Sequence, residues 1–316
     1  VIIGVVNNSD TRRCELYSQT VMTEPVQISP YLTPGSTLVQ KRKHPISSLP
    51  YMIKGNMPYD GGYLLMDVAT KNRFVEQDRR VLQYMRRIVG SDEFINGIER
   101  WCFWITDDKA DAALEIPIIK ERADLVRDLR LGKSDKNAQR LAAYPYRFRE
   151  MHETTTNSLV IPSVSSENRE YVPVGFVDKK TVVTNLAFVI YDCDPWIFGV
   201  VSSKMHNLWI KAVCGGLETR IRYSSELGYN TFPFPAITDE QKKDIRNCVN
   251  QVIAAREEEF DKTYAQMYKK DEMSDDLCFA HSMLDLQIER CYRDEPFVSD
   301  DERLDCLFEL YEKIGG

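Results

Sequence analysis

The ten residues from Phe232 to Gln241, FPFPAITDEQ, divide the chain into two parts of different character. Thr238, followed three residues later by a glutamine, forms a capping box, which marks the start of a helix. Ile245 and Val249 then recur at helical spacing. A long helix is therefore predicted to begin directly after Thr238.

The residues after this boundary predict an acidic, helical end. Apolar residues at helical spacing mark a second helix around 277–291 and a third around 304–311, the third capped by Ser299 with Glu302. From Phe232 onward the chain has 11 Lys and Arg against 21 Asp and Glu. The fold class predicted is α+β: a mixed α/β domain followed by an α-helical C-terminal bundle.

The residues before the boundary alternate helix and strand signals. Residues 1–24 predict a β-hairpin whose turn lies at Asn7–Asp10. The dense turn residues of Gly55–Gly62, GNMPYDGG, predict a tight architectural loop. Helices are expected at about 78–89, 117–132 and 204–213, and strands at 101–105, 159–162, 171–177, 181–190 and 196–201.

The charge of this first part permits nucleic-acid binding without proving it. Although the whole chain has a net charge of −7, residues 1–231 hold 30 basic and 27 acidic groups. Between 117 and 149, nine basic residues face four acidic ones. Since phosphate contacts dominate DNA affinity, a local basic excess matters more than the total charge.

Several classes of site have no signal in the sequence. The eight cysteines include no CxxC pair, and the four histidines have no partner at metal-ligand spacing, so no metal site or disulfide framework is expected. Reduced cysteines suit a cytoplasmic protein. No apolar run approaches the length of a membrane span, so no membrane contact is expected.

Catalytic motifs are also missing. An adenine-N6 methyltransferase needs a Pro-Pro-Tyr-type loop and a glycine-rich cofactor turn, and neither occurs. Asp60, Asp92 and Glu93 are available carboxylates, but they suit turns and helix caps. The chain is therefore expected to be catalytically silent alone and to hold no cofactor.

Nine blocks, in order along nearly the whole chain, resemble the MmeI-like DNA methyltransferases, which are single-chain restriction-modification enzymes. The blocks are Ile28–Leu32, Gly55–Gly62, Glu93–Ile105 (EFINGIERWCFWI), Val164–Arg169, Ser202–Trp209 (SSKMHNLW), Arg222–Ser224, Tyr229–Pro235, Ala280–Asp285 and Leu307–Glu312. Each block is a weak signal, and their shared order makes the resemblance specific.

The resemblance implies a domain arrangement. Residues 1–24 would be the end of a catalytic methyltransferase domain, 25–235 a target-recognition domain, and 236–316 a helical C-terminal domain. The parent enzyme would methylate adenine N6 with S-adenosylmethionine, with Mg²⁺ in addition if it also cleaves DNA. The partners would be double-stranded DNA and the catalytic domain missing from this chain.

Two sets of residues are candidates for DNA contact. The polar loop between two predicted strands, and two positions that the resemblance marks as specificity determinants, suit base edges: Ser165, Ser166, Glu167, Asn168, Arg169, Lys204 and His206. Basic residues suit the phosphate backbone: Arg122, Arg127, Arg130, Lys133, Arg140, Arg147, Arg149, Arg220 and Arg222. Each residue could instead belong to a solvated turn, helix start or charged face.

Two other functions remain open at this point. The acidic helical end and the aromatic-rich core would also suit a protein-interaction scaffold that never binds DNA. A self-contained enzyme with unusual motifs is the third possibility. Retention on duplex DNA that is lost with salt would separate the first function from the scaffold.

Overall fold

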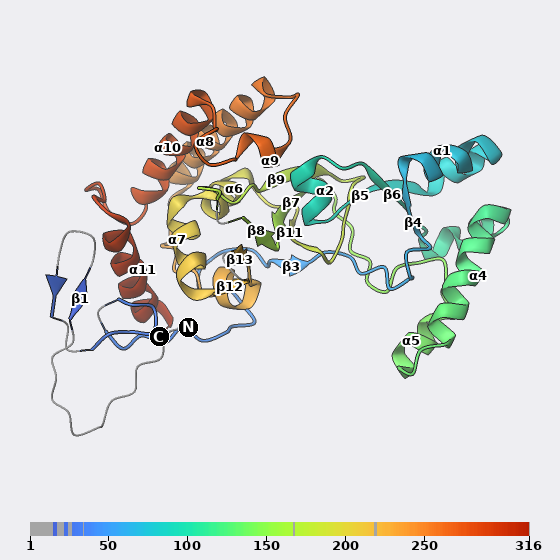
Figure 1. Cartoon of the computed structure of the whole chain (residues 1–316), viewed down its shortest axis with the longest axis horizontal. Coiled ribbons are helices and arrows are strands. Elements are labelled where there is room, and N and C mark those ends of the chain that lie inside the picture. The colour runs from blue at the N-terminus through green and yellow to red at the C-terminus, as the bar shows by residue number, and fades with distance from the viewer. Residues whose placement is uncertain are drawn as a thin grey trace.

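The computed structural model describes residues 15–17, 22–24, 27–33, 35–166, 168–217 and 220–315. Figure 1 shows a small α/β lobe at one end of the molecule and the C-terminal helices at the other, with a larger sheet between them. At the N-terminal side, β1 (Leu16–Tyr17) pairs antiparallel with β2 (Met22–Thr23). The turn predicted at Asn7–Asp10 lies outside the described residues.

The small lobe has a four-stranded sheet in the order β10-β5-β6-β4. Its strands are β4 (Leu65–Asp67), β5 (Met85–Val89), β6 (Arg100–Phe103) and β10 (Val182–Val183). Its helices are α1 (Val68–Gln77), α3 (Ala110–Leu114), α4 (Pro117–Leu131) and α5 (Lys136–Leu141). The lobe has a core of its own, in which Phe103, Ile105 and Ile119 are fully buried.

One predicted helix in this lobe is wrong. Residues 78–89 form a 3₁₀ helix, Arg79–Tyr84, followed by the strand β5. Asp78 caps the short helix by accepting a hydrogen bond from the amide of Arg80. Arg86 then pairs with Cys102 of β6. Apolar residues close together in sequence fit either periodicity, and the available sheet edge decided the outcome.

The larger sheet is antiparallel, in the order β3-β11-β7-β9. Its strands are β3 (Ile53–Lys54), β7 (Asn157–Pro162), β9 (Gly175–Asp178) and β11 (Ala187–Tyr191). Both faces of the central strands are covered. On one face Val160 and Val189 pack on α2 (Ser91–Asn96), and on the other Ile161 joins the core beneath α6 (Pro195–Ser202) and α7 (Lys204–Val213). Burial on both faces explains why these strands read as continuous apolar runs.

The strand predicted at 196–201 is also wrong, because these residues belong to α6. Asp194 accepts a hydrogen bond from the amide of Trp196, and Pro195 occupies the first turn, so the helix has a regular start. A third, small sheet has the order β12-β13-β8, from β8 (Val164–Ser165), β12 (Gly216–Leu217) and β13 (Arg220–Arg222).

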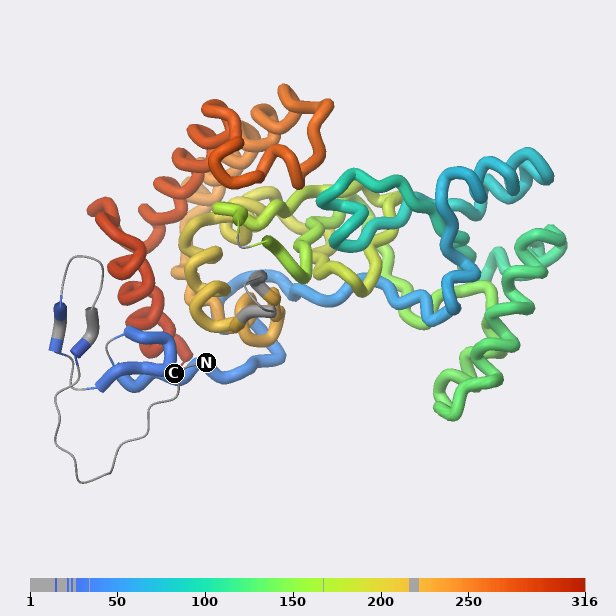
Figure 2. Tube along the Cα trace, in the orientation of Figure 1, coloured from blue at the N-terminus to red at the C-terminus, as the bar shows by residue number. Residues whose placement is uncertain are grey.

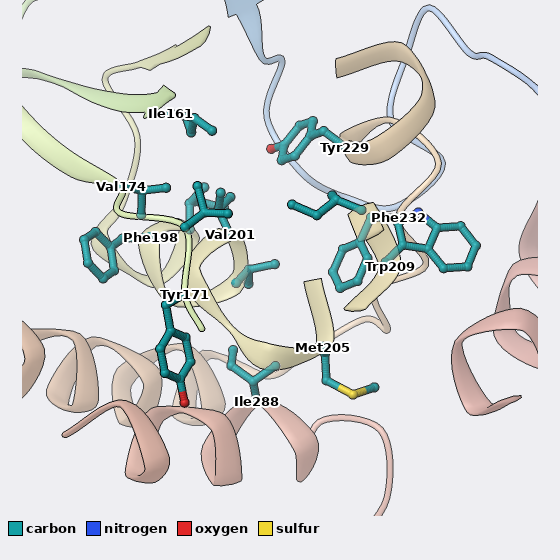
Figure 3. Close-up of a cluster of buried hydrophobic side chains, with 14 of the residues drawn as sticks. Ile161, Tyr171, Val174, Phe198, Val201, Met205, Trp209, Tyr229, Phe232 and Ile288 are labelled. Atoms are coloured by element: carbon teal, nitrogen blue, oxygen red, sulfur yellow. The ribbon is translucent and has the colours of Figure 1, made fainter. Parts of the chain in front are cut away.

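The three predicted C-terminal helices are present as α8 (Asp239–Glu258), α10 (Asp275–Glu289) and α11 (Asp300–Gly315). A fourth helix, α9 (Tyr264–Met267), was not predicted, and all four lie on the core that they share with the sheet. The capping box of Thr238 and Gln241 is present. Ile288 of α10 packs in one cluster with Phe198 and Trp209 (Figure 3). The predicted fold class, a mixed α/β domain followed by helices, is confirmed.

The tube in Figure 2 follows the same path and keeps the small lobe apart from the C-terminal helices. Among the helices of the described ranges, none combines the length and the apolar character that crossing a bilayer requires.

Candidate nucleic-acid interface

The structure brings the predicted reader loop next to one of the predicted cationic strands. In the small third sheet, Ser165 pairs with Ile221 and Val164 pairs with Arg222. The Arg222 side chain is exposed. The reader loop follows β8, and Arg222 lies on the neighbouring strand β13, although more than fifty residues separate them in the sequence.

The reader loop is a hydrogen-bonded turn that displays some of its side chains and hides others. Ser165 is buried, whereas Ser166 is half-buried and accepts a hydrogen bond from the amide of Asn168. Asn168 is exposed, and Arg169 is half-buried, with its pKa lowered by burial. Glu167 lies outside the described residues. Of the described loop residues, Asn168 is the most available to a ligand.

A second rigid turn, Thr184–Leu186, lies beside this loop, and the sequence analysis missed it. The Asn185 amide donates to the carbonyl of Asn56, at 2.9 Å. The Leu186 carbonyl accepts hydrogen bonds from the hydroxyls of Ser91, at 2.5 Å, and Ser163, at 2.8 Å. Ser163 directly precedes β8, so these bonds join the turn to the strand that carries the reader loop.

Two side chains of this turn, those of Asn185 and Leu186, are available to a ligand, whereas the buried Thr184 hydroxyl accepts a hydrogen bond from the Leu186 amide. Leu186 is 58% exposed, and the half-buried Asn185 side-chain amide has no hydrogen-bond partner among the residues that the structure describes. An amide with its donor and acceptor both available, held on a backbone fixed by several hydrogen bonds, is preorganised for a polar ligand. In the sequence, Thr184 and Asn185 look like an ordinary turn, and Asn185 was therefore missed as a candidate.

A cavity of about 340 Å³ lies where the two lobes meet. The Thr184–Leu186 turn lines one side, and Tyr59 and Gly61 of the Gly55–Gly62 loop line another. Glu93 lies in the wall. Burial alone would raise the pKa of Glu93, but hydrogen bonds from Arg100, at 2.7 Å, and from the Gly90 amide lower it overall. The Glu93 carboxylate therefore stabilises the wall of the cavity.

Cationic side chains continue this surface onto the small lobe. The Arg149 amide donates to the carbonyl of Pro58, and its guanidinium lies 5.5 Å from the centre of the Tyr59 ring. Lys133 and Arg140 are exposed on the same lobe and have no ion-pair partner in the described ranges. Six side chains together make up the recognition surface: Asn168, Arg222, Asn185, Leu186, Tyr59 and Arg149.

Three other predicted cations have internal partners but keep partial exposure. Arg122 lies over the ring of Phe74, at 5.1 Å. Arg127 pairs with Asp124 one turn earlier on α4, and Arg147 pairs with Asp107 at 2.6 Å. Of Arg220, only the backbone lies within the described structure.

Arg130 is not placed for DNA contact, which corrects the prediction. Its side chain is fully buried and donates hydrogen bonds to five backbone carbonyls, at 2.8–3.2 Å. The five carbonyls belong to Pro58, Tyr59, Leu141, Tyr144 and Arg147. A phosphate could not reach this guanidinium. Its register with Ile119, Ala123 and Val126, the buried face of α4, was a signal that helical periodicity could have detected.

His206 is likewise misplaced for base reading. The His206 ring is fully buried, its Nε2 lies 2.7 Å from the Tyr223 hydroxyl, and burial lowers its pKa to about 3. This reader assignment is corrected. The Lys204 amide donates to Asp285, at 2.7 Å, and its partly exposed amine pairs with Asp300, at 3.2 Å, so a role of Lys204 in base reading stays a prediction.

The Gly55–Gly62 loop has the architectural role predicted for it. Gly61 and Gly62 adopt positive φ angles of +66° and +86°, which favour glycine. The Asp60 carboxylate accepts hydrogen bonds from the amides of Gly62, at 3.0 Å, and Leu64, at 2.6 Å. These hydrogen bonds give the Asp60 carboxylate, which the sequence offered as a candidate carboxylate, a structural role in the loop.

No group of three or more metal-ligating side chains that could hold an ion occurs within the described ranges. The glycine pairs do not fit a nucleotide-type cofactor either. Gly61–Gly62 leads into β4, and Gly215–Gly216 follows the end of α7, whereas a cofactor turn joins a strand to the start of a helix. No cofactor site is assigned to these residues.

A two-lobed α/β unit that carries a polar surface and is backed by a helical domain is the architecture of a recognition module. The chain belongs to the MmeI family. The family model described as "MmeI, target recognition domain" matches residues 34–236, and "MmeI, C-terminal domain" matches residues 237–315. The family resemblance read from the sequence is confirmed.

Two relatives show the extent of the similarity. The chain is 42% identical over 288 residues to "DNA methyltransferase A" of Bacillus subtilis (strain 168), covering 91% of this chain and 33% of that protein. It also matches the structure of the type IIL restriction-modification enzyme MmeI in complex with DNA, with a TM-score of 0.87 and 36% identity over 93% of this chain. The match covers 39% of the MmeI chain, so this chain spans about a third of the length of its relatives.

Proposed function

We propose that this chain is the DNA-recognition part of a restriction-modification methyltransferase and that the recognition surface contacts double-stranded DNA, with its Asn168, Asn185, Leu186 and Arg222 side chains at the base edges. The observation that carries the proposal is the side-chain amide of Asn185, which has no partner among the described residues and stands on a rigid turn beside the reader loop. The relative solved with DNA, which covers almost all of this chain, supports it.

The side chains of the surface match the chemistry of base edges. An Asn amide can bond both the N6 and N7 positions of adenine, so Asn185 and Asn168 suit adenine. Leu186 can contact a thymine methyl group. Arg222 lies on the strand next to the reader loop, away from the cations of the small lobe. We therefore propose that it bonds a guanine edge rather than the phosphate first assigned to it.

The phosphate contacts would come from the small lobe. Lys133, Arg140 and Arg149 are exposed there, and Arg122, Arg127 and Arg147 are partly exposed. Phosphate contacts fix the register of a protein on the duplex without carrying sequence information. With Arg130 removed from the predicted set, these six residues are the proposed backbone contacts on this lobe.

The chemistry of methylation would belong to another part of the polypeptide. The parent enzyme would use S-adenosylmethionine to methylate adenine N6, with Mg²⁺ for any cleavage, and would act in the cytoplasm. Because neither glycine pair of the described residues fits the cofactor, the recognition surface would deliver the target base to a separate catalytic domain.

The test is enrichment of a randomised duplex pool by the chain, followed by sequencing of the bound DNA. We expect a preferred site for the unaltered chain. Asn185→Ala should relax the preference at one base pair by about 1–3 kcal/mol, because the bidentate contact is lost. Asn250→Ala, at an exposed position on α8, is the matched control and should leave the preference unchanged.

Two outcomes would contradict the proposal. If the chain binds no duplex at low salt, the scaffold function replaces DNA recognition. If it binds but Asn185→Ala keeps the full preference at every position, the Thr184–Leu186 turn does not read bases.

A further inference from the structure

The C-terminal helical domain contacts the segment that follows the reader loop. The Lys270 amide donates to the carbonyl of Asn168, at 3.0 Å. The Tyr171 ring stacks on His281 of α10 with ring centres 4.2 Å apart. Figure 3 shows the Tyr171 hydroxyl directed at the C-terminal helices, near the one that carries Ile288. The reader loop is therefore held from behind by the helical domain.

One carboxylate of this domain holds two separate segments of the recognition domain. Asp285 Oδ2 accepts a hydrogen bond from the Tyr171 hydroxyl, at 2.7 Å, and Oδ1 accepts one from the Lys204 amide, also at 2.7 Å. Asp285 and Tyr171 are both buried. Tyr171 lies two residues after Arg169 of the loop, so the position of the loop end depends on this contact.

The surroundings of Asp285 suit a fixed bridge. The Lys204 amine is drawn to Asp300 of α11, and the buried neighbour Glu289 is held by Arg303, at 2.7 Å. Asn207 of α7 donates to the carbonyl of Glu170, which fixes the residue before Tyr171. A buried, hydrogen-bonded carboxyl group resists displacement, because breaking its bonds leaves buried polar atoms unsatisfied.

We propose that Asp285 is a positioning residue for base recognition, which binds Tyr171 and the start of α7 together and so fixes the reader loop from the helical domain. This inference rests on the proposed function. It assigns the helical domain a part in base discrimination although Asp285 itself is too buried to contact DNA.

The experiment compares three variants of the full chain. Asp285→Ala removes both hydrogen bonds. Asp285→Asn can keep both, because its amide oxygen accepts from Lys204 and its NH₂ group donates to the Tyr171 hydroxyl oxygen. Tyr171→Phe removes one bond and keeps the ring stacking. Asp276→Ala, at an exposed site on the same helix, is the control.

The measured quantity is the affinity for the preferred duplex divided by the affinity for a scrambled duplex. We expect this ratio to fall about tenfold in Asp285→Ala and about threefold in Tyr171→Phe, and to stay within about twofold in Asp285→Asn. The salt dependence of binding should not change, because the phosphate contacts are untouched. Circular dichroism establishes which variants are folded.

The outcomes separate the two proposals. If the unaltered chain prefers no sequence, the proposed function fails. If it has a preference and folded Asp285→Ala keeps the full ratio, the positioning role is overturned. Should Asp285→Ala fail to fold, Tyr171→Phe and Asp285→Asn decide. A reduced ratio in Tyr171→Phe together with a nearly unchanged ratio in Asp285→Asn supports the role, and any other result overturns it.

Discussion

At the residue scale, Arg130 shows how one side chain can organise a surface that it never reaches. Its hydrogen bonds to Pro58 and Tyr59 hold the loop that lines the cavity between the two lobes. Its bond to Arg147 holds the segment that leads to Arg149. Burial lowers the pKa of this guanidinium, although the neighbouring Asp60 acts in the opposite direction. Two parts of the recognition surface therefore depend on one buried charge.

Arg130→Met should destabilise the protein strongly. The substitution removes five hydrogen bonds to backbone carbonyls from a buried site, and we expect a loss of about 3–5 kcal/mol in the free energy of unfolding. Urea unfolding followed by circular dichroism measures it. Arg140→Met, at an exposed position, should change stability by less than about 0.5 kcal/mol. Equal stability of the two variants would show that the network around Arg130 is dispensable.

At the element scale, helices with clear end signals are predicted from the sequence and ambiguous apolar runs are not. Ser203 before α7 and the capping box before α8 accept hydrogen bonds from backbone amides, and the Pro at the start of α4 has no amide hydrogen to satisfy and a φ angle that suits a helix. Residues 85–89, in which two arginines separate Met85 from Ile88 and Val89, suit a helix or a strand, and β6 decided their state by offering an edge. Residues 196–201 are a short apolar run, and their helix does have a start signal, the Asp194 cap followed by Pro195, which the prediction of a strand overlooked.

We expect the exposed cations of the small lobe to contact the DNA phosphates together. Lys133→Ala combined with Arg140→Ala should lower the slope of binding affinity against salt concentration, on logarithmic scales, by about 0.9 for each lost phosphate contact. The preferred sequence should stay the same. Binding to one duplex at several salt concentrations measures the slope.

The control for this pair is Lys243→Ala with Lys313→Ala, two exposed lysines on α8 and α11. This variant removes the same charge from the helical domain and should keep the slope. A slope that falls equally in both double variants would place the phosphate contacts elsewhere or make them depend on total charge.

At the scale of the whole molecule, the larger sheet with α6 and α7 shares one core with the C-terminal helices, whereas the small lobe has a core of its own. Within the shared core, α6 packs closely on α8. A methyl group at Gly199 of α6 would lie 2.5 Å from Ile245 Cγ2 and 3.1 Å from Leu284 Cδ1. The absence of a side chain at Gly199 is what allows the two helices to approach.

Gly199→Ala should therefore weaken the whole molecule. Overpacking at this contact should cost about 1–3 kcal/mol, and unfolding should remain a single transition because the core is shared. In Gly132→Ala, the new methyl would meet only ordinary contacts at 3.4 Å or more, so stability should hold or rise slightly. Thermal unfolding of both variants is the measurement. Separate transitions for the two domains would contradict a shared core.

The sequence by itself determined the class of the fold, the helical end, the starts of α4, α7 and α8, and the family resemblance. These features depend on residues close together in the chain: caps, turn residues, periodic apolar faces and short motifs. Local chemistry is enough to specify them.

Only the tertiary structure decided which candidate side chains face outward. His206 is of a residue type that often binds ligands, and packing buried it, whereas Asn185 looked ordinary and became a free side-chain amide on a rigid turn. Exposure depends on elements distant in sequence, such as β13 beside β8 and α10 behind Tyr171. Because contacts of that kind follow from packing the whole chain, a pattern of neighbouring residues does not encode them.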